Sequence, residues 1–281
     1  MNNAQSCPVS KLEKLLVATD RSAFSEGAIT AAIAFAKHCS SKLYVMTVVE
    51  KNPEYETAGA ELLQKETEEA ARYLASLKVR TLAEIPSCEM ILRRGDSTSR
   101  LIVEEAEQKK IDMIAVGRRG RSGLEKVLLG SAAAKAIGHA PCKVLVVPRA
   151  AQIGYKNILV ATDGSEHAST AGTEAIEIAK RTGSHLIVIS VVPSEDQKEK
   201  ARANAGYIAL AAQQAGVHTE KIALVGKPHE IIAETAKGMG VDLIVMGAYG
   251  KTGFKRLLMG STTEKVIGLA GCAVLVAKRD S

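Results

Sequence analysis

The sequence carries the same spacing of glycines twice. Around residue 117 it reads GRRGRSGLEKVLLGS, and around residue 247 it reads GAYGKTGFKRLLMGS. Both copies fit Gly, two residues, Gly, nine residues, then Gly-Ser. KLLVATDRS upstream of the first copy is matched by NILVATDGS in the second, and APCKVLVVP downstream is matched by AGCAVLVAK. A repeat of this length predicts two homologous domains, at residues 1–150 and 151–281, with two equivalent sites.

Composition indicates the class of fold. The chain of 281 residues is 46% hydrophobic but only 3% aromatic, with no Trp. A core of Val, Ile, Leu and Ala is typical of α/β proteins with buried parallel strands. Few aromatics also argue against a nucleic-acid partner, since single strands are bound by stacking on exposed rings. The net charge of +6 is compatible with a mildly basic soluble protein or with attraction to anionic ligands.

Cysteine usage and apolar patterning bear on the compartment. The five cysteines contain no CxxC pair, which favours a reduced, cytoplasmic protein. Cys142 and Cys272 stand at equivalent positions before an apolar run, so we expect small core residues there rather than reactive thiols. No signal peptide and no membrane-spanning stretch is expected, and hence no membrane partner.

Short apolar runs alternate with amphipathic stretches in both halves. This alternation predicts an α/β fold of two tandem doubly wound domains, each with a five-stranded parallel sheet in the order 3-2-1-4-5 flanked by helices. The expected strands are Leu15–Ala18, Leu43–Val48, Glu89–Leu92, Met113–Val116, Val144–Val147, Asn157–Ala161, Leu186–Val191, Lys221–Val225, Leu243–Met246 and Val274–Ala277. Helices are expected in the first half at Ser22–His38, Ala58–Leu77, Ser97–Gln108 and Ser131–His139.

The two copies differ in length and in their connections. The linker at Pro148–Gly154 is short, so the domains are expected to pack as a fixed pair. The first copy has extra residues around Lys51–Leu63, which predict a surface excursion able to cover the first site. The polar segment Met1–Ser10 is expected to be mobile.

The glycine motif combines two features that bind anions. Glycines at the end of a strand allow positive φ and let a ligand approach the backbone closely. Ser131 and Ser261 then open a helix, whose first N–H groups and dipole attract phosphate. The alternative is a tight turn followed by a capped helix, and Ser261 with Glu264 would form a capping box. Ala134 stands where Glu264 would be needed in the first copy.

Asp20 and Asp163 end the first strand of each half. Ligands of open parallel sheets bind beyond the carboxyl ends of the strands, where the strand order reverses. Each Asp should therefore meet the glycine motif in one crevice, where its carboxylate can accept hydrogen bonds from a ribose or base or help to hold Mg²⁺. The alternative is an Asp that only caps the first helix.

Several catalytic motifs are absent. A P-loop ending in Gly250-Lys251-Thr252 would need glycine where Val245 stands, and no G-x-G-x-x-G follows the first strand. The six histidines are scattered and suggest neither a metal site nor a general base. We therefore expect no catalytic residue.

These motifs resemble the universal stress protein family in its tandem form. The glycine signature occurs twice, with an ATD ending on each first strand and a PCxVLVVP-like final strand, and the resemblance covers almost the whole chain. The resemblance implies a five-stranded parallel sheet with flanking helices. It also implies ATP binding, because members with this signature bind ATP.

Carried over by position, the resemblance implies two ATP sites. In the first, the adenosine would contact Ala18, Thr19, Asp20, Val48, Val116 and Gly117, and the phosphates Arg119, Gly120, Gly130, Ser131, Ala132 and Ala133. In the second, the adenosine would contact Ala161, Thr162, Asp163, Val191, Met246 and Gly247, and the phosphates Tyr249, Gly250, Gly260, Ser261, Thr262 and Thr263. The second site is the more typical, because Thr262 and Thr263 add hydroxyls, whereas Ala132 and Ala133 offer only backbone. Arg119 can compensate with a charge-assisted contact.

The leading expectation is an ATP-binding stress-response protein that acts as a nucleotide sensor or regulator, with Mg²⁺ as an optional companion of ATP and an unidentified protein partner. One alternative is a slow ATP hydrolase. Another is a module that binds a protein or a polyanion through Arg118, Arg119 and Arg121. Single-domain relatives commonly form dimers, so one chain would supply the equivalent pair, and further pairing into a homodimer is compatible with the sequence.

Overall fold

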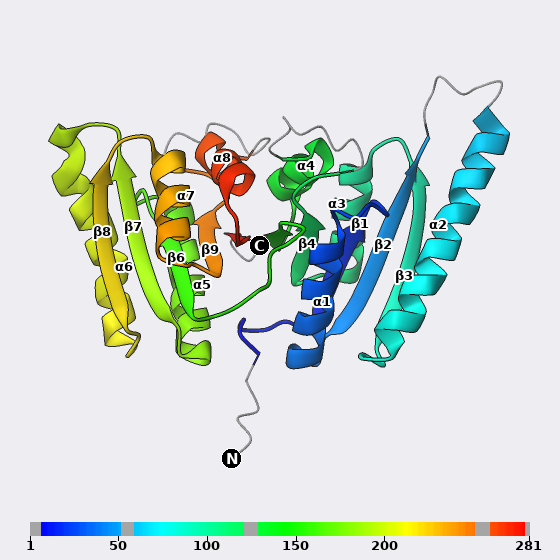
Figure 1. The fold of residues 1–281 in the computed structure, drawn as a ribbon, viewed down its shortest axis with the longest axis horizontal. Coiled ribbons are helices and arrows are strands. Elements are labelled where there is room, and N and C mark those ends of the chain that lie inside the picture. Colours follow the sequence, from blue (N-terminus) through cyan, green and yellow to red (C-terminus); the bar gives the residue numbers. More distant parts are fainter. Residues whose placement is uncertain (1–6, 52–58, 121–128, 251–258, 279–281) are drawn as a thin grey trace, which may run out of the picture.

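A computed structural model describes residues 7–51, 59–120, 129–250 and 259–278. Within these residues, ten strands form one sheet in the order β3-β2-β1-β4-β5-β10-β9-β6-β7-β8 (Figure 1). The strands are β1 (Lys14–Thr19), β2 (Lys42–Glu50), β3 (Cys88–Gly95), β4 (Met113–Gly117), β5 (Lys143–Val147), β6 (Asn157–Ala161), β7 (His185–Val192), β8 (Thr219–Val225), β9 (Leu243–Gly247) and β10 (Ala273–Ala277). Each half thus has the predicted strand order 3-2-1-4-5.

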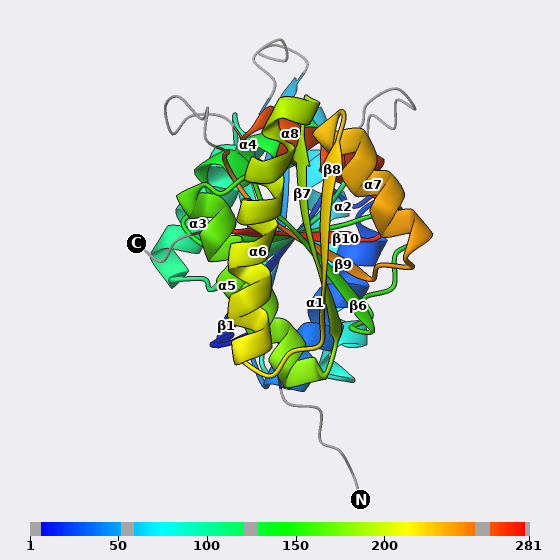
Figure 2. The ribbon, with the colours of Figure 1, turned by 90° about the vertical axis from the view of Figure 1, so that its left-hand side faces the viewer.

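Helices cover both faces of this sheet (Figure 2). They are α1 (Glu26–Cys39), α2 (Gly59–Leu82), α3 (Thr98–Lys109), α4 (Ser131–His139), α5 (Glu166–Thr182), α6 (Lys198–Gln214), α7 (Pro228–Gly238) and α8 (Ser261–Leu269). One apolar cluster joins α1, α2, α5 and α6 to one face, and a second joins α3, α4, α7 and α8 to the other. Leu15 and Leu16 are both fully buried, in different clusters, which explains why the strands are continuously apolar.

The two halves meet through their last strands. β5 and β10 pair antiparallel, with Val146 opposite Val274 and Leu145 opposite Leu275. The other strand pairs within the described residues are parallel. The halves therefore share one backbone ladder as well as a linker, which goes beyond the fixed pair that the short linker predicted.

The N-terminal segment is partly packed, contrary to prediction. Val9 is 1% exposed and Leu12 is buried, both in the cluster on the α1 face. Burial of these side chains brings Cys7 next to the end of α1, where it forms a disulfide with Cys39. The expectation that all five cysteines are reduced is therefore wrong for this pair. Residues 1–6 lie outside the described residues.

Cys142 and Cys272 pack beside the core, as predicted. Each is partly buried against the cluster on the α4 and α8 face. Burial raises the pKa of the Cys142 thiol to about 12 and that of Cys272 to about 11. Little reactive thiolate is therefore present at neutral pH.

The extra length of the first half includes part of a longer helix. α2 has 24 residues, against 17 in α6. The remainder of the predicted excursion, at 52–58, lies outside the described residues. Among the helices that the structure describes, none is long and apolar enough to cross a membrane.

The central strand pair should contribute strongly to stability. Leu145 in β5 is 1% exposed, so Leu145→Ala leaves a cavity and should lower the free energy of unfolding by about 2–5 kcal/mol. Leu210→Ala on α6 is the matched control, since Leu210 is 57% exposed and should matter by about 0.5 kcal/mol or less. Urea unfolding followed by circular dichroism measures both. Equal losses in the two variants would contradict this assignment of the core.

Candidate functional site

Each half has a cavity at the carboxyl ends of its strands, where the strand order reverses. The first cavity is about 440 Å³ and lies between the ends of β1 and β4, and the second is about 400 Å³ and lies between the ends of β6 and β9. The structure brings together all the residues predicted for each site. Around the first are Ala18, Thr19, Asp20, Val48, Val116, Gly117, Arg119, Gly120, Gly130, Ser131, Ala132 and Ala133. Around the second are Ala161, Thr162, Asp163, Val191, Met246, Gly247, Tyr249, Gly250, Gly260, Ser261, Thr262 and Thr263.

The two aspartates organise the loops after β1 and β6. Asp20 Oδ1 accepts hydrogen bonds from the backbone N and the Oγ of Ser22, at 3.1 and 2.7 Å. Asp163 Oδ1 accepts one from Ser165 N at 2.9 Å. The residues that cap α1 and α5 are Ser25 and Ser165, so the helix-cap alternative for the aspartates is wrong. Asp20 Oδ2 is buried and has no hydrogen-bond partner within the described residues, so one acceptor of a residue that lines the first cavity is unpaired there.

The second glycine of each motif allows close approach of the loop to this carboxylate. A Cβ at Gly250 would lie 2.8 Å from Asp163 Oδ2, and a Cβ at Gly120 would lie 3.5 Å from Asp20 Oδ2. Neither residue uses the positive φ that glycine allows, because neither is among the described glycines with a left-handed backbone. Their small size, rather than their conformational freedom, fits the structure.

Helices α4 and α8 begin at the cavities with backbone N–H groups that have no partner within the helix. Gly130 and Gly260 are the N-cap residues, and neither helix has a side-chain cap bond. The first intrahelical bonds run from Ala134 N to Gly130 O and from Glu264 N to Gly260 O. The N–H groups of the three preceding residues in each helix therefore have no partner within the helix. They lie at the positive end of the helix dipole, which favours an anion.

The predicted capping box at the second site is wrong. Ser261 is the first residue of α8, one position too late to cap the helix. Thr263 also differs from the expectation of an available hydroxyl. It is 4% exposed, and its Oγ1 donates to Gly247 O at 2.9 Å. Thr262 is therefore the threonine whose hydroxyl is left for a ligand.

Sequence reasoning missed part of both cavity walls. In the first the additional residues are Ser25, Met46, Glu50, Glu66, Thr98 and Ile102. In the second they are Ala168, Ile189, Pro228, Ile232 and Met259. Met46 and Ile189 could have been found, because they stand two positions before Val48 and Val191 and so lie on the same face of their strands. Ile102 and Ile232 come from helices whose orientation the sequence alone does not give.

The two cavities carry different charges. The first is lined by Arg119 and by the carboxylates of Asp20, Glu50 and Glu66, whereas Asp163 is the one ionised side chain among the described residues that line the second. Arg119 Nε is buried and has no hydrogen-bond partner within the described part of the chain. Its contact with an anionic ligand stays a prediction. No group of three or more His, Cys, Asp or Glu side chains within the described residues is placed to hold a metal ion.

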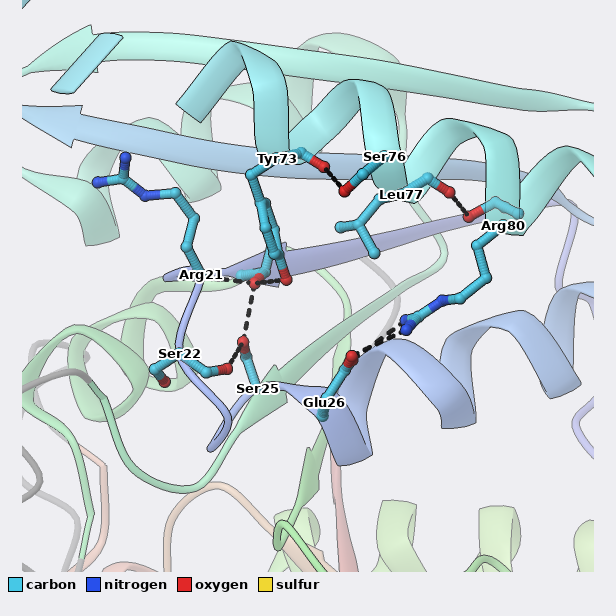
Figure 3. A network of polar contacts seen from close by, with 10 residues as sticks. Arg21, Ser22, Ser25, Glu26, Tyr73, Ser76, Leu77 and Arg80 are labelled. Carbon is cyan, nitrogen blue, oxygen red and sulfur yellow. Dashed lines mark hydrogen bonds and ion pairs between the residues drawn. The ribbon is translucent and has the colours of Figure 1, made fainter. Parts of the chain in front are cut away.

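A polar network ties α2 to the first cavity (Figure 3). The Tyr73 hydroxyl lies 3.3 Å from Thr19 Oγ1, and Thr19 Oγ1 lies 2.8 Å from Ser25 Oγ. A second link joins Arg21 Nη1 to the backbone oxygen of Glu66 at 3.1 Å. Arg21 has φ +69°, a left-handed conformation that the second half gives to Gly164 at φ +75°. The first cavity is therefore closed on one side by α2, which contributes Glu66.

Nearer the carboxyl-terminal end of α2, an ion pair joins this helix to α1. Arg80 donates to both carboxylate oxygens of Glu26 in α1, at 2.8 and 3.1 Å (Figure 3). This contact lowers the pKa of Glu26 and raises that of Arg80. Both side chains are largely exposed, so the pair contributes little to stability.

The arginine cluster of the first motif is partly committed within the protein. Arg118 Nη1 donates to Ala270 O at 2.6 Å and to Gly268 O at 3.3 Å, both in the second half. Burial lowers the pKa of its guanidinium, and neighbouring Arg119 lowers it further. The polyanion alternative loses one of its three arginines to these contacts, and Arg121 lies outside the described residues.

Comparisons with known proteins agree with this architecture. The model of the universal stress protein family matches residues 11–148 and again residues 154–278. A universal stress protein of Mycolicibacterium smegmatis is 28% identical over 256 residues, covering 84% of this chain and 81% of the relative. One from Methanocaldococcus jannaschii is 37% identical over 141 residues, covering 44% of this chain and 83% of the relative. The crystal structure of a universal stress protein from Archaeoglobus fulgidus superposes with a TM-score of 0.72 at 25% identity, covering 96% of this chain and 100% of that one. The chain belongs to the universal stress protein family, and it contains two tandem copies of the domain that the family model describes.

The hydroxyl of Tyr73 should stabilise the first half. Tyr73→Phe keeps the ring but removes the bond to Thr19, and we expect a loss of about 1 kcal/mol in the free energy of unfolding. Tyr207→Phe is the matched control, because Tyr207 is 72% exposed. Urea unfolding curves measure both variants. A Tyr73→Phe variant as stable as the control would show that the network is not formed in solution.

Proposed function

We propose that this chain binds an adenine nucleotide in each of two domains, residues 1–150 and 151–281, and acts as a nucleotide-dependent regulator in a stress response. The observation that carries the proposal is duplicated geometry. In each half, one cavity of nucleotide size is lined both by an aspartate and by the first residues of a helix, whose N–H groups have no partner within that helix. The same glycine signature accompanies ATP binding in the family that the chain belongs to.

The chemistry of the cavity walls supports this assignment. The apolar side chains of Val48, Ile102 and Val116 can pack against the faces of an adenine, while backbone groups at the strand ends bind its edge. Ile232 and Met246 supply the same kind of surface in the second cavity. Asp20 and Asp163 are suited to accept hydrogen bonds from ribose hydroxyls, and the N–H groups of α4 and α8 to hold phosphates. Mg²⁺ would then be bound mainly through the phosphates.

The proposed mode of action is binding rather than turnover. A bound nucleotide bridges the strand-end loop and the following helix, and so changes the surface that the protein presents to a partner. That partner is proposed to be a protein, and the proposed location is the cytoplasm.

Two glycine substitutions test the proposal. Gly130→Val and Gly260→Val place side chains where the phosphates would lie, and each should remove one equivalent of bound Mg-ATP, whereas the double variant should bind none. Gly238→Val is the matched control, since nothing lies within 4 Å of a Cβ at that position. Isothermal titration calorimetry gives the stoichiometry, and circular dichroism shows whether each variant is folded. Two equivalents bound by the folded double variant would refute the two sites.

A further inference from the structure

Helices α4 and α8 are held at their carboxyl-terminal ends by the opposite half of the chain. The two helices lie near the middle of the molecule (Figure 1). Arg118, which follows β4, donates to Gly268 O in α8 and to Ala270 O, the residue after that helix. In the other direction, the Tyr249 hydroxyl donates to Gly138 O in α4 at 2.7 Å, and Lys278 Nζ donates to the same oxygen at 3.1 Å.

These contacts supply hydrogen-bond donors to backbone carbonyl groups at the ends of the two helices. The last carbonyl groups of a helix have no intrahelical donor and lie at the negative end of its dipole. The Arg118 guanidinium meets one such carbonyl group, that of Gly268, and also the carbonyl group of Ala270 just beyond the helix, and both hydrogen bonds are charge-assisted. Lys278 brings a cation to the end of α4, where the Tyr249 ring lies 5.4 Å from its Nζ.

The opposite ends of the same helices line the two cavities. α4 and α8 each have nine residues, a rigid length of about 14 Å. Tilting or shifting the carboxyl-terminal end of so short a helix also moves its first N–H groups. Those are the N–H groups of Ser131–Ala133 in the first cavity and of Ser261–Thr263 in the second.

Resting on the function proposed above, we propose that each nucleotide site is positioned by the other half of the chain. Arg118 belongs to the first glycine motif but is a positioning residue of the second site. Tyr249 and Lys278 belong to the second half but position the first site. None of these three residues needs to touch the nucleotide that it helps to bind.

The position of Arg118 indicates a role in the second site rather than in the first site, whose glycine motif contains it. Its neighbours Gly117 and Arg119 line the first cavity, whereas Arg118 does not. The equivalent residue in the second motif is Ala248, so the contact is not simply a consequence of the repeat. Tyr249 lines the second cavity and also contacts α4. A ligand in the second cavity that touches Tyr249 is therefore linked through this one side chain to α4, the helix that lines the first cavity.

Affinities measured for each site separately test this crossed assignment. Gly130→Val leaves the second site open, and Gly260→Val leaves the first. Arg118→Met should weaken Mg-ATP binding about tenfold in the Gly130→Val protein, and by less than about twofold in the Gly260→Val protein. Arg118→Lys keeps a cation at the end of α8 and should restore part of the second-site affinity. Arg72→Met, at an exposed position on α2, is the matched control.

Hydrogen exchange of the nucleotide-free protein gives an independent readout. Arg118→Met should speed exchange of the backbone N–H groups of α8 and leave those of α4 unchanged. Unchanged exchange in α8, an unchanged second-site affinity, or an equal loss at both sites would each overturn the assignment. If neither single-site protein binds Mg-ATP, the proposed function itself fails, and exchange in α8 still decides whether Arg118 holds that helix.

Discussion

The antiparallel pairing of β5 with β10 is the interaction on which the rest of the molecule depends. It joins two five-stranded parallel sheets into one. It also brings each strand-end loop within reach of the opposite half, so that Arg118 reaches the end of α8 and Tyr249 reaches α4. Without this pair, α4 and α8 would lose the contacts from the opposite half that hold their carboxyl-terminal ends.

Much of the fold followed from local pattern. Continuous runs of Val, Ile and Leu alternating with amphipathic stretches predict a parallel sheet covered on both faces, and the strands lie close to the predicted residues. The start of α1 differed, at Glu26 rather than Ser22. The reason is that Ser22 bonds to Asp20 in the preceding loop and Ser25 bonds to Thr19 at the end of β1, which delays the start of the helix. The β5–β10 pairing could not be predicted, because the two strands read alike whether their edges are free or paired.

The candidate sites were predictable wherever a residue lies in the repeated motif. The glycines, the aspartates and the helix starts all meet around the two cavities. Contributions from distant elements were not predictable. Glu66, for example, lines the first cavity only because of the way in which α2 lies against the sheet. The commitment of the Thr263 hydroxyl to Gly247 O was equally hidden, because the sequence gives the residue type but not its rotamer. Duplication thus predicts equivalent sites, while the surrounding elements make them unequal.

The most direct test of two nucleotide sites is the content of the protein as it is purified. The protein, prepared without added nucleotide, would be denatured, and the released small molecules identified and quantified per chain by mass spectrometry. Our account predicts ATP or ADP approaching two per chain, or filling to two when Mg-ATP is added. No nucleotide on release, and none bound on addition of Mg-ATP, would contradict it and leave the glycine motifs as structural turns.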